Sequence, residues 1–132
     1  MIGIVVVSHS AQLAEGVVEL AGQMTGGQVP MAAAGGGPDG GLGTDVERIK
    51  AAIERVMTSN GVLVLMDLGS AVMSAEVAVE SLDPDVAGRV RLSNAPVVEG
   101  AVIAAVESSI GKSLDEVDRS ANDAAGMQKV ER

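Results

Sequence analysis

The stretch GIVVVSHSAQLAEG, residues 3–16, decides the fold class of this chain. It opens with a continuous run of apolar residues, which is typical of a strand that is covered on both faces of a parallel sheet. A short polar segment with His9 follows, and a helical pattern begins directly after it. This succession predicts the first half of a β-α-β unit, and it places His9, the only histidine of the chain, where the strand ends.

Three further segments are predicted as strands. Residues 61–66, GVLVLM, repeat the continuous apolar character of residues 2–7, so these two segments are expected at the centre of the sheet. Residues 28–33 contain Pro30, which is tolerated at a sheet edge, and residues 89–93 alternate charged and apolar side chains. The predicted strand order is therefore 2-1-3-4.

Five helical patterns lie between and after these strands. The second opens with a capping box from Thr44 to Glu47, and the fourth carries Pro96 in its first turn. The third runs from about residue 70 to 82, before Asp83-Pro84, and the fifth begins at Ser113. Apolar residues recur at helical spacing on one side of the first and fourth patterns, at Leu13, Val17, Leu20, Ala21 and Met24, and at Val98, Val102, Ala105 and Val106.

The order of these elements predicts an α/β fold. We expect one domain over residues 1–132, a doubly wound four-stranded parallel sheet with helices on both faces. The chain has no aromatic residue, so Val, Ala, Leu, Ile and the seven Met are expected to fill the core, with helices close to the sheet.

Charge and composition limit the partners. A net charge of −9, without a basic run or an aromatic side chain, argues against nucleic-acid binding. The absence of cysteine excludes disulfides and thiolate chemistry. The apolar runs are too short for a membrane span, and the N-terminus lacks the basic region of a signal peptide, so a cytoplasmic protein with no membrane partner is expected.

The predicted strand order also places a candidate site. In an open α/β sheet, ligands bind beyond the carboxyl ends of the strands, where the winding direction reverses. Here that point falls between the first and third strands, so His9 and Asp67 should face each other across it. The glycine-rich residues 32–43 and the turn at residues 94–96 should border the same edge.

A histidine beside a carboxylate can carry a phosphoryl group. The carboxylate holds one ring N–H and leaves the other nitrogen as a nucleophile, while helix N-termini favour phosphate. His9 is thus the expected phosphoryl acceptor and donor, with Asp67 orienting it. The expected phosphate-binding residues are Ser10, with Ser8 as an alternative hydroxyl, and Gly69 and Ser70, and the rim loop is expected to include Gly41, Gly43 and Thr44.

Simpler interpretations stay open at this point. His9 could be an ordinary loop residue, Asp67 and Thr44 could merely cap helices, and the glycine-rich loop could be a flexible connector. The loop lacks the Gly-Lys-Ser/Thr of a P-loop, no dinucleotide fingerprint follows the first strand, and no Gly-x-Ser-x-Gly occurs. One imidazole makes a weak metal site, so neither a metal nor a cofactor is expected.

Four segments together resemble a known family: IGIVVVSHSAQLAEGVVELAGQM, GGGPDGGLGTDVERI, GVLVLMDLGSAVMSAEVAVE and LSNAPVVEGAVIAAV. They are similar to the mannose-type EIIA domains of the sugar phosphotransferase system, in the branch that serves phosphoenolpyruvate-dependent dihydroxyacetone kinases. The resemblance covers nearly the whole chain. The segment Asp67–Ser70 matches the kinase branch, because sugar-transport members typically carry a tryptophan there that this chain lacks.

The resemblance implies a phosphotransferase function without a cofactor. His9 would accept phosphate from the phosphocarrier protein HPr and pass it to ADP on the nucleotide-binding subunit of the kinase, and the chain would form a homodimer. Two alternatives remain, namely an EIIA domain of a mannose-type sugar transporter and a non-catalytic regulatory binding module. The residues after Gly111 contribute little to the resemblance and are predicted to be helical, so no exchanged terminal strand is expected.

Overall fold

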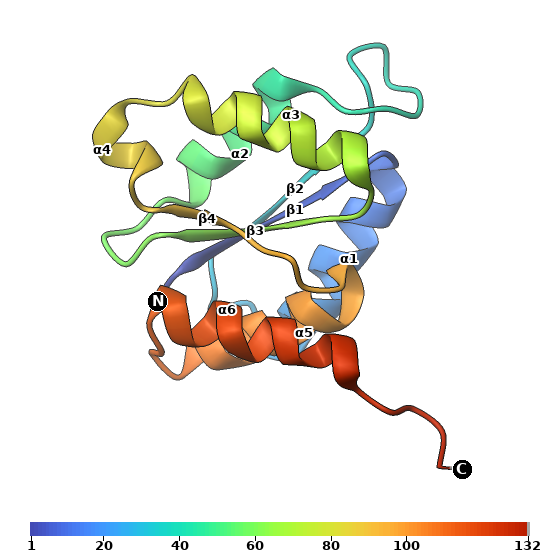
Figure 1. The fold of residues 1–132 in the computed structure, drawn as a ribbon, viewed down its shortest axis with the longest axis vertical. Coiled ribbons are helices and arrows are strands. Elements are labelled where there is room, and N and C mark those ends of the chain that lie inside the picture. Colours follow the sequence, from blue (N-terminus) through green and yellow to red (C-terminus); the bar gives the residue numbers. More distant parts are fainter. Residues whose placement is uncertain (132) are drawn as a thin grey trace.

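The computed structural model describes residues 1–131 and contains four strands that pair in parallel in the order β2-β1-β3-β4, as predicted (Figure 1). The strands are β1 (Gly3–Ser8), β2 (Met31–Gly35), β3 (Val62–Met66) and β4 (Val90–Leu92). The register aligns Val5 of β1 with Ala32 of β2 on one side and with Val64 of β3 on the other. The two continuous apolar runs thus form the central strands.

Helices cover both faces of the sheet (Figure 1). One face carries α1, α5 and α6, and the opposite face carries α2, α3 and the short α4. Alternate residues of β1 serve the two layers, with Ile4 and Val6 on the first face and Val5 and Val7 on the second. The helices are α1 (Ala11–Gln23), α2 (Val46–Val56), α3 (Gly69–Glu80), α4 (Pro84–Ala87), α5 (Val97–Ser109), α6 (Leu114–Asp123) and the 3₁₀ turn η1 (Ala124–Gly126).

The core consists of aliphatic side chains of small and medium size. The largest fully buried side chains are all Ile, Leu or Val, and each contributes about 1.5–3 kcal/mol by burial. Methionine does not fill the core as predicted, since Met66 is the only buried methionine among residues 1–131, whereas Met24 and Met73 are 58% and 67% exposed.

The helices rest on the sheet through their smallest residues. α1 buries Ala14, Val17 and Ala21, whereas Leu13 and Leu20 are 42% and 43% exposed. α5 likewise buries Gly100, Ala101, Ala104, Ala105 and Ser108, whereas Val98 and Val106 lie at the surface. Val17, Ala21 and Ala105 of the predicted apolar spacings are thus confirmed on the packing side, whereas Leu13, Leu20, Val98 and Val106 are not. Side-chain size does not mark the packing side of these helices. Close helix–sheet contact selects Ala and Gly, because a longer side chain there would push the helix away from the sheet.

Several predicted boundaries are corrected by the structure. β2 begins at Met31, so Pro30 lies outside the strand and only its carbonyl joins the sheet, accepting from the Ile4 amide at 2.9 Å. The predicted capping box of α2 is wrong. Asp45 is the N-cap, with its side chain accepting from the amides of Glu47 and Arg48. Asp83-Pro84 was predicted only as the stop after the third helix. That helix, α3, ends at Glu80, and Pro84 begins α4, since proline suits a first helical position.

Candidate functional site

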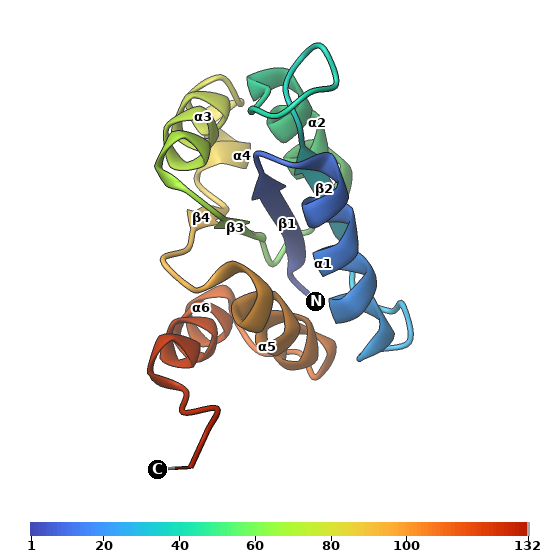
Figure 2. The same ribbon diagram turned by 90° about the vertical axis from the view of Figure 1, so that its right-hand side faces the viewer.

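The site lies where the sheet reverses its winding, beyond the carboxyl ends of β1 and β3. The loops that follow β1 and β2 lie at the same end of the sheet in Figure 2. His9 follows β1 and Asp67 follows β3, and the His9 ring nitrogen Nδ1 lies 2.9 Å from Asp67 Oδ1. The sequence prediction that these two side chains face each other is confirmed.

Asp67 accepts four hydrogen bonds. Oδ1 accepts from the His9 ring and from the Leu68 amide at 2.7 Å. Oδ2 accepts from the Ser8 hydroxyl at 2.8 Å and from the His9 amide at 3.0 Å. Burial by itself raises the pKa of Asp67, but the bonds from the His9 amide, the Ser8 hydroxyl, the His9 ring and the Leu68 amide outweigh burial and hold the pKa below its usual value. Asp67 is therefore a carboxylate at neutral pH.

The charge of Asp67 decides the tautomer of His9. A carboxylate can only accept, so in the neutral ring Nδ1 carries the proton and Nε2 keeps its lone pair. The Ser70 hydroxyl lies within hydrogen-bond distance of Nε2 and donates to it. The side chain of His9 is 26% exposed and that of Asp67 is 13% exposed. The pair is thus held from the side of the buried Ser8, while the hydrogen-bond partner of Nε2 is a serine hydroxyl that can rotate.

Two serines flank His9 and have different contacts. Ser8 is fully buried, and its hydroxyl donates to Asp67 and accepts from the Ser10 amide at 3.0 Å. The sequence suggested Ser8 only as an alternative hydroxyl that donates a hydrogen bond to the phosphate. Its hydrogen bond to Asp67 was not predicted, since this contact depends on side-chain direction. Ser10 is the N-cap of α1, where its side chain accepts from the Leu13 amide.

Two helices begin at the site. α1 starts right after Ser10, and α3 starts at Gly69, two residues after Asp67. The N-cap of α3, Leu68, provides no side-chain cap, so water or a ligand must satisfy the first amides of this helix. A Cβ atom at Gly69 would meet nothing within 4 Å, so there is open space beside the first residue of α3. This arrangement suits an anion next to Nε2.

The glycine-rich loop between β2 and α2 is attached to the His9 segment. The Gly36 amide donates to the Ser8 carbonyl at 3.2 Å, and the Gly43 amide donates to the His9 carbonyl at 2.9 Å. Gly43 has a φ of 139°, a conformation that L side chains rarely adopt. At the start of the loop, a Cβ at Gly35 would lie 2.5 Å from the Ser10 carbonyl oxygen, so only glycine lets β2 end this close to α1.

The remaining predicted rim residues have separate contacts. Gly41 takes part in a tight turn of the loop, where its amide donates to Asp39 Oδ1 at 3.0 Å. Thr44 forms a hydrogen bond between its hydroxyl and that of Ser74 on α3, with the oxygens 2.6 Å apart. Ser74 was not predicted, although its spacing of four residues from Ser70 in a helix could have indicated a shared face.

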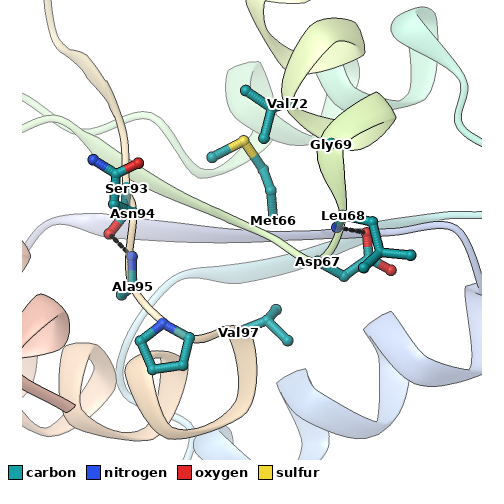
Figure 3. A pocket seen from close by; sticks show the side chains of 10 residues that line it. Met66, Asp67, Leu68, Gly69, Val72, Ser93, Asn94, Ala95 and Val97 are labelled. Atoms are coloured by element: carbon teal, nitrogen blue, oxygen red, sulfur yellow. Dashed lines mark hydrogen bonds between the residues drawn. The ribbon is translucent and has the colours of Figure 1, made fainter. Parts of the chain in front are cut away.

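Two shallow clefts lie next to the segments that carry the His9–Asp67 pair, one lined by Asp67 and the other by Ser10. One, of about 310 Å³, lies between the residues after β3 and the turn after β4, and Figure 3 shows the Met66 and Val72 side chains together at this cleft, with that of Asn94 beside them. The other, of about 270 Å³, lies between the start of α1 and the glycine-rich loop. Residues 94–96 line the first cleft and the glycine-rich loop lines the second, so both segments lie at the edge of the sheet where they were predicted.

The described part of the chain offers neither a clustered metal site nor a membrane-spanning helix. Over residues 1–131, the structure contains no group of three or more His, Asp or Glu side chains placed to hold a metal ion. None of the helices in this range combines the length and the apolar character that a membrane crossing requires.

Comparison with known proteins identifies relatives over almost the full chain. The profile of the EIIA-man family, described as PTS system fructose IIA component, matches residues 3–118. The phosphoryl donor subunit DhaM of the phosphoenolpyruvate-dependent dihydroxyacetone kinase of Klebsiella michiganensis is 43% identical over 99% of this chain, which spans 28% of that relative. The DhaM subunit of dihydroxyacetone kinase 2 of Listeria innocua is 39% identical and is covered over 94% of its length.

A solved structure supports the fold. The crystal structure of EF1359, a protein of unknown function, has a TM-score of 0.81 and 32% sequence identity to this chain, and 92% of each chain is covered.

Proposed function

The chain belongs to the EIIA-man family of the phosphotransferase system and to its branch of dihydroxyacetone kinase phosphoryl donor subunits, and on this basis we propose that it carries a phosphoryl group on His9. The observation that carries the proposal is the bond from His9 Nδ1 to Asp67 Oδ1, which leaves Nε2 as the nucleophile. The donor is phosphorylated HPr. The acceptor is ADP held by the nucleotide-binding subunit of a dihydroxyacetone kinase.

The transfer step involves one bond exchange at phosphorus. The lone pair of His9 Nε2 attacks the phosphorus of the donor phosphohistidine in line. The Nε2–P bond forms as the donor N–P bond breaks, and the electron pair of that bond stays with the donor ring. The proton on Nδ1 remains in place. Because the transition state of phosphoryl transfer is loose, positioning and charge stabilisation supply most of the catalysis.

Asp67 and the helix N-termini stabilise different charges during transfer, Asp67 that of the His9 ring and the helix N-termini those of the phosphoryl oxygens. The His9 ring becomes more positive as Nε2 bonds to phosphorus, and the adjacent carboxylate of Asp67 stabilises that charge. The Ser70 hydroxyl must leave Nε2, and it can then donate to a phosphoryl oxygen. The amides of Gly69 and Ser70 and the hydroxyl of Ser10 complete the phosphate-binding group. Gly41, Gly43 and Thr44 belong to the rim loop around this group and do not bind the phosphate.

The surface around His9 suits protein partners. Exposed apolar side chains lie on three of the elements that border the site: Leu13 on α1, Leu42 on the glycine-rich loop, and Leu68, Val72 and Met73 at the start of α3. We call these five residues the apolar rim. Leu42, at 83%, is the most exposed large apolar side chain among residues 1–131, and exposed apolar residues that gather near a site are typical of a surface that binds a protein. A shallow apolar rim accommodates two successive protein partners better than a deep pocket would.

The deciding test is the intact mass of the protein after incubation with phosphoenolpyruvate, enzyme I and HPr, with His9→Ala as the control. The proposal predicts one acid-labile phosphoryl group on the wild type and none on His9→Ala. A His9→Ala protein that is still phosphorylated contradicts it. A wild type that a competent donor leaves unmodified would favour the regulatory binding module.

The acceptor separates the two catalytic branches of the family. Phosphorylated protein is mixed with the ADP-loaded kinase subunit in one reaction and with the IIB component of a mannose-type transporter in another. Formation of ATP in the first reaction supports the kinase branch, and transfer only to the IIB component supports the sugar-transport branch. The homodimer is a further part of the proposal, and sedimentation velocity tests it directly.

A further inference from the structure

A hydroxyl pair at the rim of the site, without contact to His9 or Asp67, joins the glycine-rich loop to α3. Thr44 Oγ1 and Ser74 Oγ lie 2.6 Å apart, and both residues are partly buried. The pair has no role in starting α2, because Asp45 caps that helix. Within residues 1–131, it is also the only hydrogen bond between a side chain of α3 and residues 36–45.

Both elements that the pair joins also contact His9. On the loop side, the amide of Gly43, the residue before Thr44, donates to the His9 carbonyl at 2.9 Å. On the helix side, Ser70 lies one turn before Ser74, and its hydroxyl contacts His9 Nε2. The Thr44–Ser74 bond therefore closes a ring that runs from the His9 main chain, through the loop and α3, to the His9 ring.

The rest of the loop depends largely on its own short turns. The Gly37 amide donates to the Gly41 carbonyl at 2.8 Å, and the Gly40 amide donates to the Gly37 carbonyl at 3.0 Å. Arg48 fixes the start of the loop, where its guanidinium donates to the Gly35 carbonyl at 3.0 Å. The end of the loop, by contrast, is held at Gly43 and Thr44. A chain with several glycines has high conformational entropy, so these last contacts decide how well the loop is ordered.

We propose that the Thr44–Ser74 hydroxyl pair is a positioning latch that holds the end of the glycine-rich loop against α3 and so sets the geometry around His9 Nε2. Its effect on transfer rests on the proposed function, whereas its effect on loop order does not. Thr44 and Ser74 act through Gly43 and Ser70 and do not need to touch the phosphoryl group. Since small displacements of reacting groups strongly slow transfer, loss of the latch should slow phosphorylation of His9 by about tenfold.

The test compares Thr44→Val, Ser74→Ala and the double variant with the wild type. Thr44→Val keeps the shape of the side chain and removes its hydroxyl, and Thr44→Ser keeps the hydroxyl. The matched control is Ser81→Ala, which removes a hydroxyl at the far end of α3, where it donates to the Ala78 carbonyl. Two quantities are measured, namely hydrogen exchange of the Gly43 amide and the rate of phosphoryl transfer from phosphorylated HPr.

We expect faster exchange at Gly43 and slower transfer in both single variants, no further loss in the double variant, and near wild-type behaviour of Thr44→Ser and Ser81→Ala. Unchanged exchange in Thr44→Val overturns the latch, and so does faster exchange with an unchanged transfer rate. Additive losses in the double variant also overturn it, because two residues that act through one bond cannot lose it twice. If the wild type accepts no phosphate, the proposed function fails, and exchange at Gly43 alone decides on the latch.

Discussion

Replacing Asp67 by asparagine tests the central argument with the smallest change of shape. The carboxylate accepts four hydrogen bonds, two on each oxygen, from Ser8, Leu68 and the amide and ring of His9. Asparagine offers one oxygen and one NH₂ group, and the NH₂ group would face a main-chain amide in either orientation, that of His9 or that of Leu68, which cannot accept a hydrogen bond. No orientation of the amide side chain satisfies all four.

Each orientation of the asparagine side chain harms the site in its own way. If its oxygen faces the His9 ring, the NH₂ group meets the His9 amide, and the ring loses the negative charge that stabilises it during transfer. If the NH₂ group faces the ring, Nδ1 can pair only as an acceptor. The ring proton then moves to Nε2, and the nucleophilic lone pair is lost.

The expected loss follows from the bonds involved. A hydrogen bond to a charged partner is worth about 1.5–3 kcal/mol, and here it is strengthened in the transition state, so we expect a loss of about 2–3 kcal/mol. At 1.36 kcal/mol for each factor of ten, transfer from phosphorylated HPr should be about 30 to 150 times slower. Rapid quench followed by intact mass measures this rate.

Stability and a matched control complete this experiment. The control is Asp85→Asn in the first turn of α4, where an exposed carboxylate lies outside the site, and we expect it to behave like the wild type. Unfolding in urea checks that Asp67→Asn is folded. A folded Asp67→Asn protein that accepts phosphate at the wild-type rate would refute the role of Asp67 in orienting His9.

Three other predictions follow from contacts near the site. Ser8→Ala leaves the partly buried Asp67 Oδ2 and the Ser10 amide each without one partner, so the free energy of unfolding in urea should fall by about 1–3 kcal/mol. Gly35→Ala places a Cβ 2.5 Å from the Ser10 carbonyl oxygen, so the free energy of unfolding in urea should fall by about 1–3 kcal/mol. In the control variant Gly16→Ala on α1, the new Cβ meets nothing within 4 Å, and the free energy of unfolding should rise by about 0.5–1 kcal/mol. The pKa of Asp67 is lower in the folded than in the unfolded protein, so its contribution is complete above about pH 4 and is lost as the pH falls further. The difference in stability between the wild type and Asp67→Asn should therefore shrink in acid, as urea titrations between about pH 7 and pH 2 can show.

The sheet could be predicted because its central strands have an unambiguous pattern. Residues 2–7 and 61–66 are apolar at every position that the sheet covers, and the structure places both strands at the centre. β2 was displaced in the prediction because MAAAG combines residues of high helix propensity with a preceding proline. Its true start is set by pairing with β1, where Ile4 aligns with Met31, and no local signal contains that information.

The helix faces could not be read from side-chain size alone. The helical spacing of Leu13 and Leu20 is real, but α1 packs through Ala14 and Ala21, which follow the same spacing one residue later. A chain without aromatic residues can bring its helices close to the sheet only if alanine and glycine lie beneath them. The absence of aromatic residues thus indicates a short distance between the helices and the sheet. In such a chain the positions of alanine and glycine should decide which helix face is buried, ahead of the positions of the most hydrophobic residues.

Part of the site could be predicted from strand order, and part of it depends on side-chain directions that the sequence does not specify. The meeting of His9 and Asp67 follows from strand order, because both residues lie at the carboxyl ends of adjacent central strands. The contacts of Ser8 and Ser74 depend on which way a short side chain points, and the sequence does not specify that direction. Ser8 nevertheless explains how the proposed function can rest on a single imidazole: its hydroxyl donates to Asp67, Asp67 accepts from Nδ1 of His9, and Nε2 is left as the proposed nucleophile. In the proposed function the reactivity of His9 depends on these two partners of the ring, so variants of Ser8 and Asp67 should alter the transfer rate although neither residue has to touch the phosphoryl group.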